Sequence, residues 1–189
     1  MDIFTNVRIG EGVENIGANA FYGCTNLTDI TISDSVTVTG YSALAQTGIE
    51  TLTLPRHLAE IDTNAFYDCK ALTSIRIPDS VKVIAQCAFK DCENLAEVHL
   101  PENLTEIGAN AFRLCRSLKQ VEIPDSVTKI GAKAFSACDN LEKVTLPENI
   151  TELGESVLNI RNGYYDLKNV YRKMLMKRGI TGKKQKIRK

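Results

Sequence analysis

Short stretches of alternating apolar and polar residues recur along most of the chain. In the stretch LKQVEIP, Val121 and Ile123 are apolar, whereas Gln120 and Glu122 are polar. Such alternation over a few residues predicts a short β-strand with one buried face. The stretches LTDITIS, LTSIRIP and LAEVHLP have the same form, and Pro-Asp-Ser or Pro-Glu-Asn usually follows, which is turn chemistry.

A second apolar pattern follows each turn, with steps of three, four and one. In one unit it comprises Val127, Ile130, Ala134, Phe135, Cys138 and Leu141. This spacing predicts one or two helical turns that present a single apolar face. One unit cannot bury that face alone, but units stacked in register bury it continuously, with strands adding side by side at about 4.8 Å. The pattern therefore predicts a repeat solenoid with a parallel sheet.

The aromatic and thiol positions define the period of this repeat. Phe66, Phe89, Phe112 and Phe135 are 23 residues apart, and a cysteine follows each of them three positions later. We expect each phenylalanine to stack on its counterpart in the next unit. The series begins with Phe21 and Cys24, and the second copy is irregular, with Leu44 for phenylalanine, Thr47 for cysteine and one residue fewer. We expect seven units of about 23 residues over residues 1–158.

The motif L-x-x-[IV]-x-[IL]-P-x-S-V-T-x-I-G-x-x-A-F-x-x-C, read from Leu72 to Cys138, resembles the BspA-like (Treponema-type) leucine-rich repeat proteins. The resemblance covers roughly residues 7–158. It implies a right-handed, curved solenoid with short parallel strands on the concave face and short helical or 3₁₀ turns elsewhere. It also implies a bacterial surface or secreted protein that acts in adhesion. Thr39 and Leu44 depart from the pattern, and we expect them to weaken stacking locally.

The net charge of zero conceals two regions of opposite charge. Residues 161–189 contain eleven Lys and Arg against one acidic residue, and residues 1–160 contain twelve basic against twenty-two acidic residues. The chain is therefore an acidic body of net charge −10 with a basic end of net charge +10, and a boundary lies near residue 160.

The basic end has its own pattern. An apolar stripe with helical spacing predicts an amphipathic helix from about Tyr165 to Arg178, ended by Gly179. We interpret residues 159–180 as a helical cap over the last unit and 181–189 as a basic, disordered tail. The alternative is that residues 161–189 bind nucleic acid or an anionic membrane.

The residue types that carry catalysis or bind metals are scarce. The ladder cysteines are expected to be free, buried thiols that pack as small apolar groups, whereas Cys87 lies outside the ladder and is the thiol expected to react. The chain has no CxxC motif or Cys/His cluster, and its two histidines, His57 and His99, have no suggested catalytic partners. We expect no catalytic, cofactor-binding or metal-binding residues and no small-molecule substrate.

The outward positions of the strands form two polar columns that vary from unit to unit while the core stays constant. We expect a monomer whose concave face binds a protein partner, such as a host or bacterial surface protein, although a purely structural sheet would tolerate the same variation. Neither column contains an aromatic anchor of the kind that binding hot spots favour. The candidate contact residues are Asp29, Thr31, Thr51, Thr53, Ser74, Arg76, Glu97, His99, Gln120, Glu122, Lys143 and Thr145.

Location follows from the resemblance rather than from a targeting segment. The start, MDIFTNVRIGEGVEN, shows no signal peptide, and no stretch approaches the roughly 20 apolar residues that cross a bilayer. The resemblance implies an extracellular or cell-surface adhesin. The alternative is a cytoplasmic scaffold or effector that uses the same face.

Overall fold

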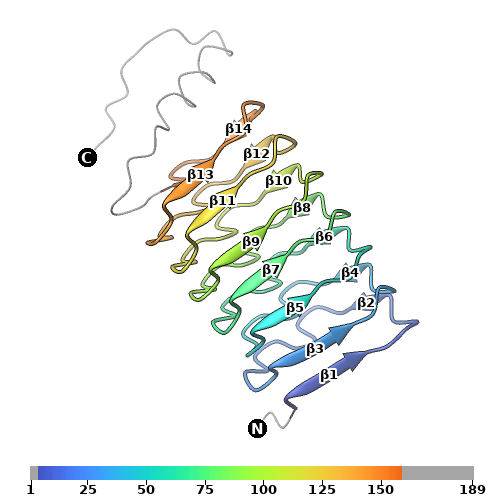
Figure 1. The fold of residues 1–189 in the computed structure, drawn as a ribbon. Coiled ribbons are helices and arrows are strands. Elements are labelled where there is room, and N and C mark those ends of the chain that lie inside the picture. Colours follow the sequence, from blue (N-terminus) through green and yellow to red (C-terminus); the bar gives the residue numbers. More distant parts are fainter. Residues whose placement is uncertain (1–3, 159–189) are drawn as a thin grey trace, which may run out of the picture.

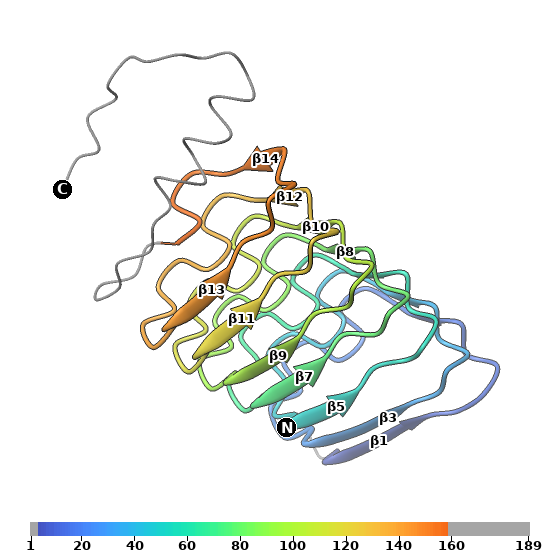
Figure 2. The same cartoon turned by 45° about the horizontal axis from the view of Figure 1, so that its top comes forward.

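The computed structural model describes residues 4–158, which form a solenoid of stacked coils (Figure 1). Each coil contributes one strand of two to four residues to each of two rows, which lie on different sides of the coil (Figure 2). We number the coils 1 to 7 by their strand pairs, so that coil 1 holds β1 and β2. The odd-numbered strands are β1 (Asn6–Ile9), β3 (Asp29–Ile32), β5 (Thr51–Thr53), β7 (Ser74–Arg76), β9 (Glu97–His99), β11 (Gln120–Glu122) and β13 (Lys143–Thr145). The even-numbered strands are β2 (Asn15–Ile16), β4 (Val38–Thr39), β6 (Glu60–Ile61), β8 (Val83–Ile84), β10 (Glu106–Ile107), β12 (Lys129–Ile130) and β14 (Glu152–Leu153).

The strands pair in parallel, and their register keeps equivalent residues of successive coils side by side. Ser74 lies opposite Glu97, and Gln120 lies opposite Lys143. Within each odd-numbered strand the side chains alternate, as in β9, where Val98 is buried and the residues on both sides of it are exposed. The parallel strands and the alternation agree with the sequence prediction. The face formed by the odd-numbered strands, called the odd-strand face below, is the one predicted to be concave.

The predicted helical turns are wrong, because residues 4–158 contain no helix. In coil 3 the N–H groups of Asn64, Phe66 and Asp68 donate to carbonyl groups of coil 4 at 2.8–3.1 Å. The residues between them close tight turns within the coil instead, as Tyr67 does by donating to the carbonyl of Asn64. Asn64 and Asp68 have φ values of 56° and 57°, in the left-handed region. Every second N–H thus donates to the next coil, so the bonds within the coil never follow one another as they would in a helix.

The phenylalanine column forms the centre of the core. The rings of Phe66, Phe89, Phe112 and Phe135 stack face to face with centroids 5.1–5.2 Å apart. All four side chains are buried. Their stacking is as predicted from the sequence, and it begins only after coil 2, where Leu44 occupies the column.

The predicted helical cap at 159–180 and the basic tail at 181–189 lie outside the described residues, so both stay predictions.

Candidate protein-binding face

The twelve candidate contact residues all belong to odd-numbered strands, and their side chains point away from the core. Eleven of them are exposed, and Ser74 is half-buried. The alternation within each strand explains this placement, because the residue between two outward positions packs inside the coil. The structure therefore places the candidates on one continuous face. It does not test whether they bind a partner.

Two grooves lie on this face. The first, the hydroxyl groove, has a volume of about 620 Å³ and runs over coils 2 to 4. Its polar lining comes from Asp29, Thr31, Ser33, Asp34, Thr51, Thr53, Ser74 and Arg76.

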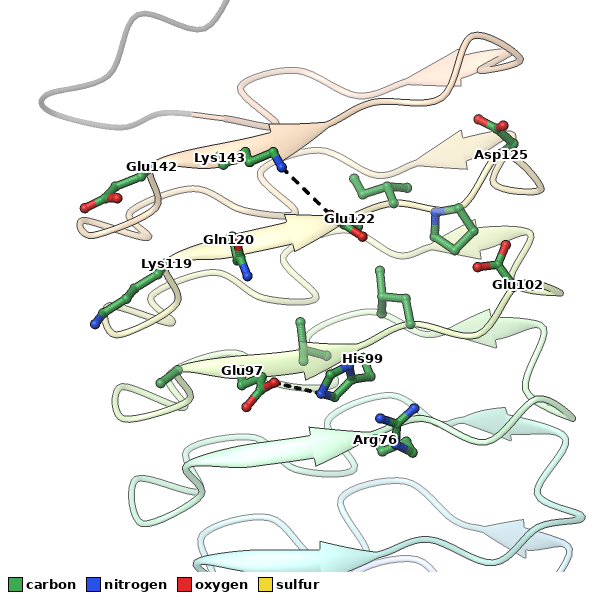
Figure 3. Close-up of a pocket in the computed structure, with 15 residues that line it drawn as sticks. Arg76, Glu97, His99, Glu102, Lys119, Gln120, Glu122, Asp125, Glu142 and Lys143 are labelled. Atoms are coloured by element: carbon green, nitrogen blue, oxygen red, sulfur yellow. Dashed lines mark ion pairs between the residues drawn. The ribbon is translucent and has the colours of Figure 1, made fainter.

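The second, the charged groove, has a volume of about 1020 Å³ and runs over coils 4 to 7 (Figure 3). Its charged and polar lining comes from Arg76, Glu97, His99, Glu102, Lys119, Gln120, Glu122, Asp125, Glu142 and Lys143. Arg76 lines both grooves, and Thr145 is the one candidate residue that lines neither.

Sequence reasoning missed the charged rim of the second groove. Figure 3 shows Lys119 and Glu142 at the beginnings of strands, and Glu102 and Asp125 beyond strand ends. The last two belong to the Pro-Glu-Asn and Pro-Asp-Ser segments, which were interpreted only as turns. Their recurrence every 23 residues beside the strands is the signal that could have placed them on the face.

The charges of the second groove are only partly neutralised within the protein. Lys143 Nζ lies 3.9 Å from Glu122 Oε1. His99 Nε2 lies 2.8 Å from Glu97 Oε1, a contact that is an ion pair only when the imidazole is protonated. Arg76 forms no ion pair with any carboxylate of residues 4–158. Exposed pairs contribute little to stability, about 0–1 kcal/mol. These side chains can therefore exchange their internal partners for those of another protein at small cost.

One ion pair at the rim of the hydroxyl groove is held by two hydrogen bonds. Asp34 accepts a hydrogen bond from the backbone N–H of Arg56 at 2.8 Å and a second from its Nε at 2.7 Å. These bonds to the carboxylate, the backbone bond first, hold the pKa of Asp34 below its usual value. Asp34 therefore stays ionised at the edge of the groove.

The ladder cysteines form no disulfide and are buried in the core, as predicted, except that Cys24 of coil 1 is only half-buried. The thiol of Cys115 donates to the carbonyl of Phe89 in the preceding coil at 3.2 Å, and Cys92 and Cys138 make the same contact with the phenylalanine one coil before their own. Burial raises the pKa of Cys92 and Cys115 well above the usual value and that of Cys138 to about 12. These three thiols thus stay protonated near neutral pH and serve packing. Cys87 is half-buried, and its predicted reactivity stays a prediction.

In the part of the chain that the structure describes, no three His, Cys, Asp or Glu side chains come together in a way that could hold a metal ion. Nor does any helix within residues 4–158 offer the long apolar stretch that a membrane span needs.

Parallel strands stacked coil on coil around a continuous aliphatic and phenylalanine core define a leucine-rich repeat solenoid. The chain belongs to the family with the BspA type leucine rich repeat region, which matches residues 2–75 and 59–170 in six copies. No curated protein matches the chain.

Solved structures agree with this assignment. A leucine-rich repeat protein of Treponema pallidum is 32% identical with a TM-score of 0.77, and the match covers 90% of this chain and 83% of the treponemal one. A leucine-rich repeat protein of Bacteroides ovatus is 23% identical with a TM-score of 0.65, over 84% of this chain and 47% of that one. A leucine-rich repeat protein of Eubacterium ventriosum is 23% identical with a TM-score of 0.56, over 82% and 51%. The last two similarities concern the fold alone.

Proposed function

We propose that the chain is a non-catalytic adhesion module whose odd-strand face binds a protein at a host or bacterial surface. The family supports the general class, because leucine-rich repeat proteins are protein-interaction modules. One observation supports this face in particular. Two grooves run along it and meet at Arg76, an arginine without an internal carboxylate partner among residues 4–158.

The chemistry of the two grooves differs, which favours a macromolecular partner that spans both. Hydroxyl groups predominate in the first groove, whereas the second carries five carboxylates against three cations, Arg76, Lys119 and Lys143. A guanidinium that is exposed and unpaired binds carboxylates in a bidentate manner, and arginine is enriched at binding hot spots. Arg76 would therefore anchor the centre of the contact, with groups of both signs on the partner around it.

The proposal is tested by reversing charge on this face. The triple variant Arg76→Glu, Glu97→Lys, Glu122→Lys is compared with the parent in binding to a panel of purified host and bacterial surface proteins. We expect capture of the partner to be lost while the melting temperature is kept, since all three side chains are exposed. Unchanged capture would refute the odd-strand face as the binding surface.

The even-numbered strands offer a matched control. The variant Glu60→Lys, Lys129→Glu, Glu152→Lys also reverses one base and two acids at exposed positions. It exchanges the signs of the Lys129–Glu152 ion pair rather than breaking it. We expect this control to capture the partner as the parent does. Surface location is tested separately, by whether an antibody to the chain labels intact cells.

A further inference from the structure

The first coil has the surface of an internal coil but no coil before it among the described residues. Val13 occupies the column filled by Val36, Val81 and Val127, and it is 40% exposed, whereas those three are fully buried. Phe21 is half-buried in the column where Phe66 and the later rings are buried. The coil therefore leaves on its outer side an apolar surface of the kind that the other coils bury against each other.

Glycine at position 17 is consistent with a coil in front of coil 1. In coils 2, 5, 6 and 7 the same column holds a glycine, and a Cβ there would lie 2.2–2.7 Å from the backbone of the preceding coil. A Cβ on Gly17 would meet nothing within 4 Å. Coil 1 thus keeps a glycine for which the described chain shows no steric need. Asp62 and Ala85 occupy the column in coils 3 and 4, so a small side chain can be accommodated there.

Backbone polarity determines what can occupy this end. Between coils 1 and 2, the N–H groups of Asn19 and Phe21 donate to the carbonyl groups of Tyr41 and Ala43. Every turn repeats this direction, from one coil to the next. The carbonyl groups of Ala18 and Ala20 hold the accepting positions in coil 1, so the occupant must bring N–H donors at the same spacing. If the first coils of two chains met through this turn, carbonyl groups would face carbonyl groups and no hydrogen bonds could form.

Coil 7 carries the complementary groups. The N–H of Lys133 donates to Glu155 and that of Phe135 donates to Val157, so Ser156 and Leu158 hold the next donor positions in the described chain. Val144 and Leu153 are half-buried there, although their counterparts Val121 and Ile130 in coil 6 are buried. Coil 7 packs on coil 6 by the same coil-to-coil contact that recurs along the solenoid. Coil 1 of one chain could therefore pack on coil 7 of another chain in the same way.

We propose that the N-terminal end of the solenoid binds the C-terminal coil of a second copy of this chain, head to tail. The contact would be heterologous, so it leaves a free end on each assembly and permits open chains of more than two copies. This departs from the monomer expected from the sequence, because the polarity of the two ends is visible only in the structure. It also replaces the predicted cap, because the second copy would occupy the side of coil 7 that residues 159–180 were expected to cover.

The experiment is sedimentation of the full-length chain over a range of concentrations. We expect the weight-average mass to rise above the 20.9 kDa of one chain as the concentration rises to about 100 µM, which would populate a contact with a Kd of about 10 µM. A mass of 20.9 kDa throughout would overturn the proposal.

Two variants test the end itself. Val13→Glu places a carboxylate where the contact would bury it, and Gly17→Leu introduces a side chain that is free in one chain but crowded in the contact. We expect each to weaken association at least tenfold. The control Gly10→Ser adds the side chain that Ser33 carries in coil 2, and should associate as the parent does. Association that survives both variants at parental strength would refute the proposal.

Mixing tests the polarity of the contact. The Gly17→Leu chain keeps an intact C-terminal coil, so an excess of it should occupy N-terminal ends of the parent and lower the mean mass of parental assemblies. A mean mass that does not fall would contradict a head-to-tail contact. This outcome is independent of the odd-strand face and its adhesive role.

Discussion

Coils 3 to 6 and coils 1 to 2 have the same fold but differ in how well they bury their side chains. In coils 3 to 6 the phenylalanine rings form an unbroken stack with centroids 5.1–5.2 Å apart. In coil 2 Leu44 interrupts the column, and Phe21 of coil 1 makes no ring contact with another described aromatic residue. All large apolar side chains that are exposed within residues 4–158 belong to the first two coils: Phe4, Val13, Tyr22, Val38 and Tyr41.

The interior of coil 2 is irregular as well. Thr39, Ser42 and Thr47 are buried there, whereas Ser136 is the one other buried polar residue in the described chain. Thr39 Oγ1 has no hydrogen-bond partner within residues 4–158. Burial in a solenoid thus depends on the match between neighbouring coils, because each residue packs against its equivalents on either side.

The largest expected effect comes from breaking the regular stack. Phe112→Ala removes a buried ring that stacks on two others, and we expect it to lower the free energy of unfolding by about 4 kcal/mol. Phe21→Ala, in the half-buried position of coil 1, should cost about 1–2 kcal/mol. Urea denaturation measures both. Equal losses would mean that ring stacking does not distinguish the two regions.

An intermediate effect is expected at alkaline pH. The usual pKa of a thiol is 9.0, and burial raises that of Cys92, Cys115 and Cys138. Between pH 9 and about 12 these thiols therefore bind fewer protons in the unfolded chain than in the folded one, so their contribution to the free energy of unfolding should be constant below pH 8 and should fall above pH 9. Each thiol contributes about 1.4 kcal/mol per pH unit in that range.

The variants Cys115→Ala and Thr47→Ala separate the two regions in this measurement. Cys115→Ala should make the decrease of the free energy of unfolding with pH shallower by the contribution of one thiol. Thr47 holds the cysteine column in coil 2 and does not titrate, so Thr47→Ala should lower stability while the number of titrating thiols stays the same. Because it removes a hydrogen bond that lowers the pKa of Cys69, the decrease should be at least as steep as in the parent. An identical slope in Cys115→Ala and the parent would show that the buried thiols do not cause the decrease.

The smallest expected effect is a repair of coil 2. Thr39→Val replaces a buried hydroxyl that has no described partner with a methyl group of similar shape, and should raise the free energy of unfolding by about 1 kcal/mol. Thr47→Val should instead lower it by about 1 kcal/mol, because Thr47 Oγ1 donates to the carbonyl of Leu44 at 3.0 Å. Thermal denaturation distinguishes the expected rise in stability from the expected fall. A loss in both variants would mean that Thr39 is better satisfied than its surroundings indicate.

The sequence was sufficient for features that depend on the repeat itself. The odd-numbered strands, their register and the buried ladder cysteines all follow from columns 23 residues apart. The even-numbered strands were missed, because a strand of two residues has no period to read. The turns were misassigned as helical, because apolar steps of three, four and one fit both a helix and a series of tight turns. Only the neighbouring coil decides where the N–H groups donate.

The columns also contain a signal for the turns that was not used. Asn19, Asn64 and Asn110 all have φ near 57°, a conformation that asparagine tolerates better than most residues. Cys87 and Lys133 share the column and the conformation, which weakens the signal. For the candidate site, the sequence predicted correctly that the two polar columns point outward. It could not predict that two grooves meet at Arg76, because the shape of a groove depends on how adjacent strands pack.

Because the register is constant in the regular stack, the number of coils can change without changing the fold of each coil. Leu100 and Ile123 hold the same column, so excising residues 101–123 would join Leu100 to Pro124 as Ile123 is joined now. The shortened protein would need no new core, and duplicating the same segment would extend it. The reach of such a surface is therefore adjustable in increments of one strand, about 4.8 Å each, while the chemistry of the remaining turns is unaltered.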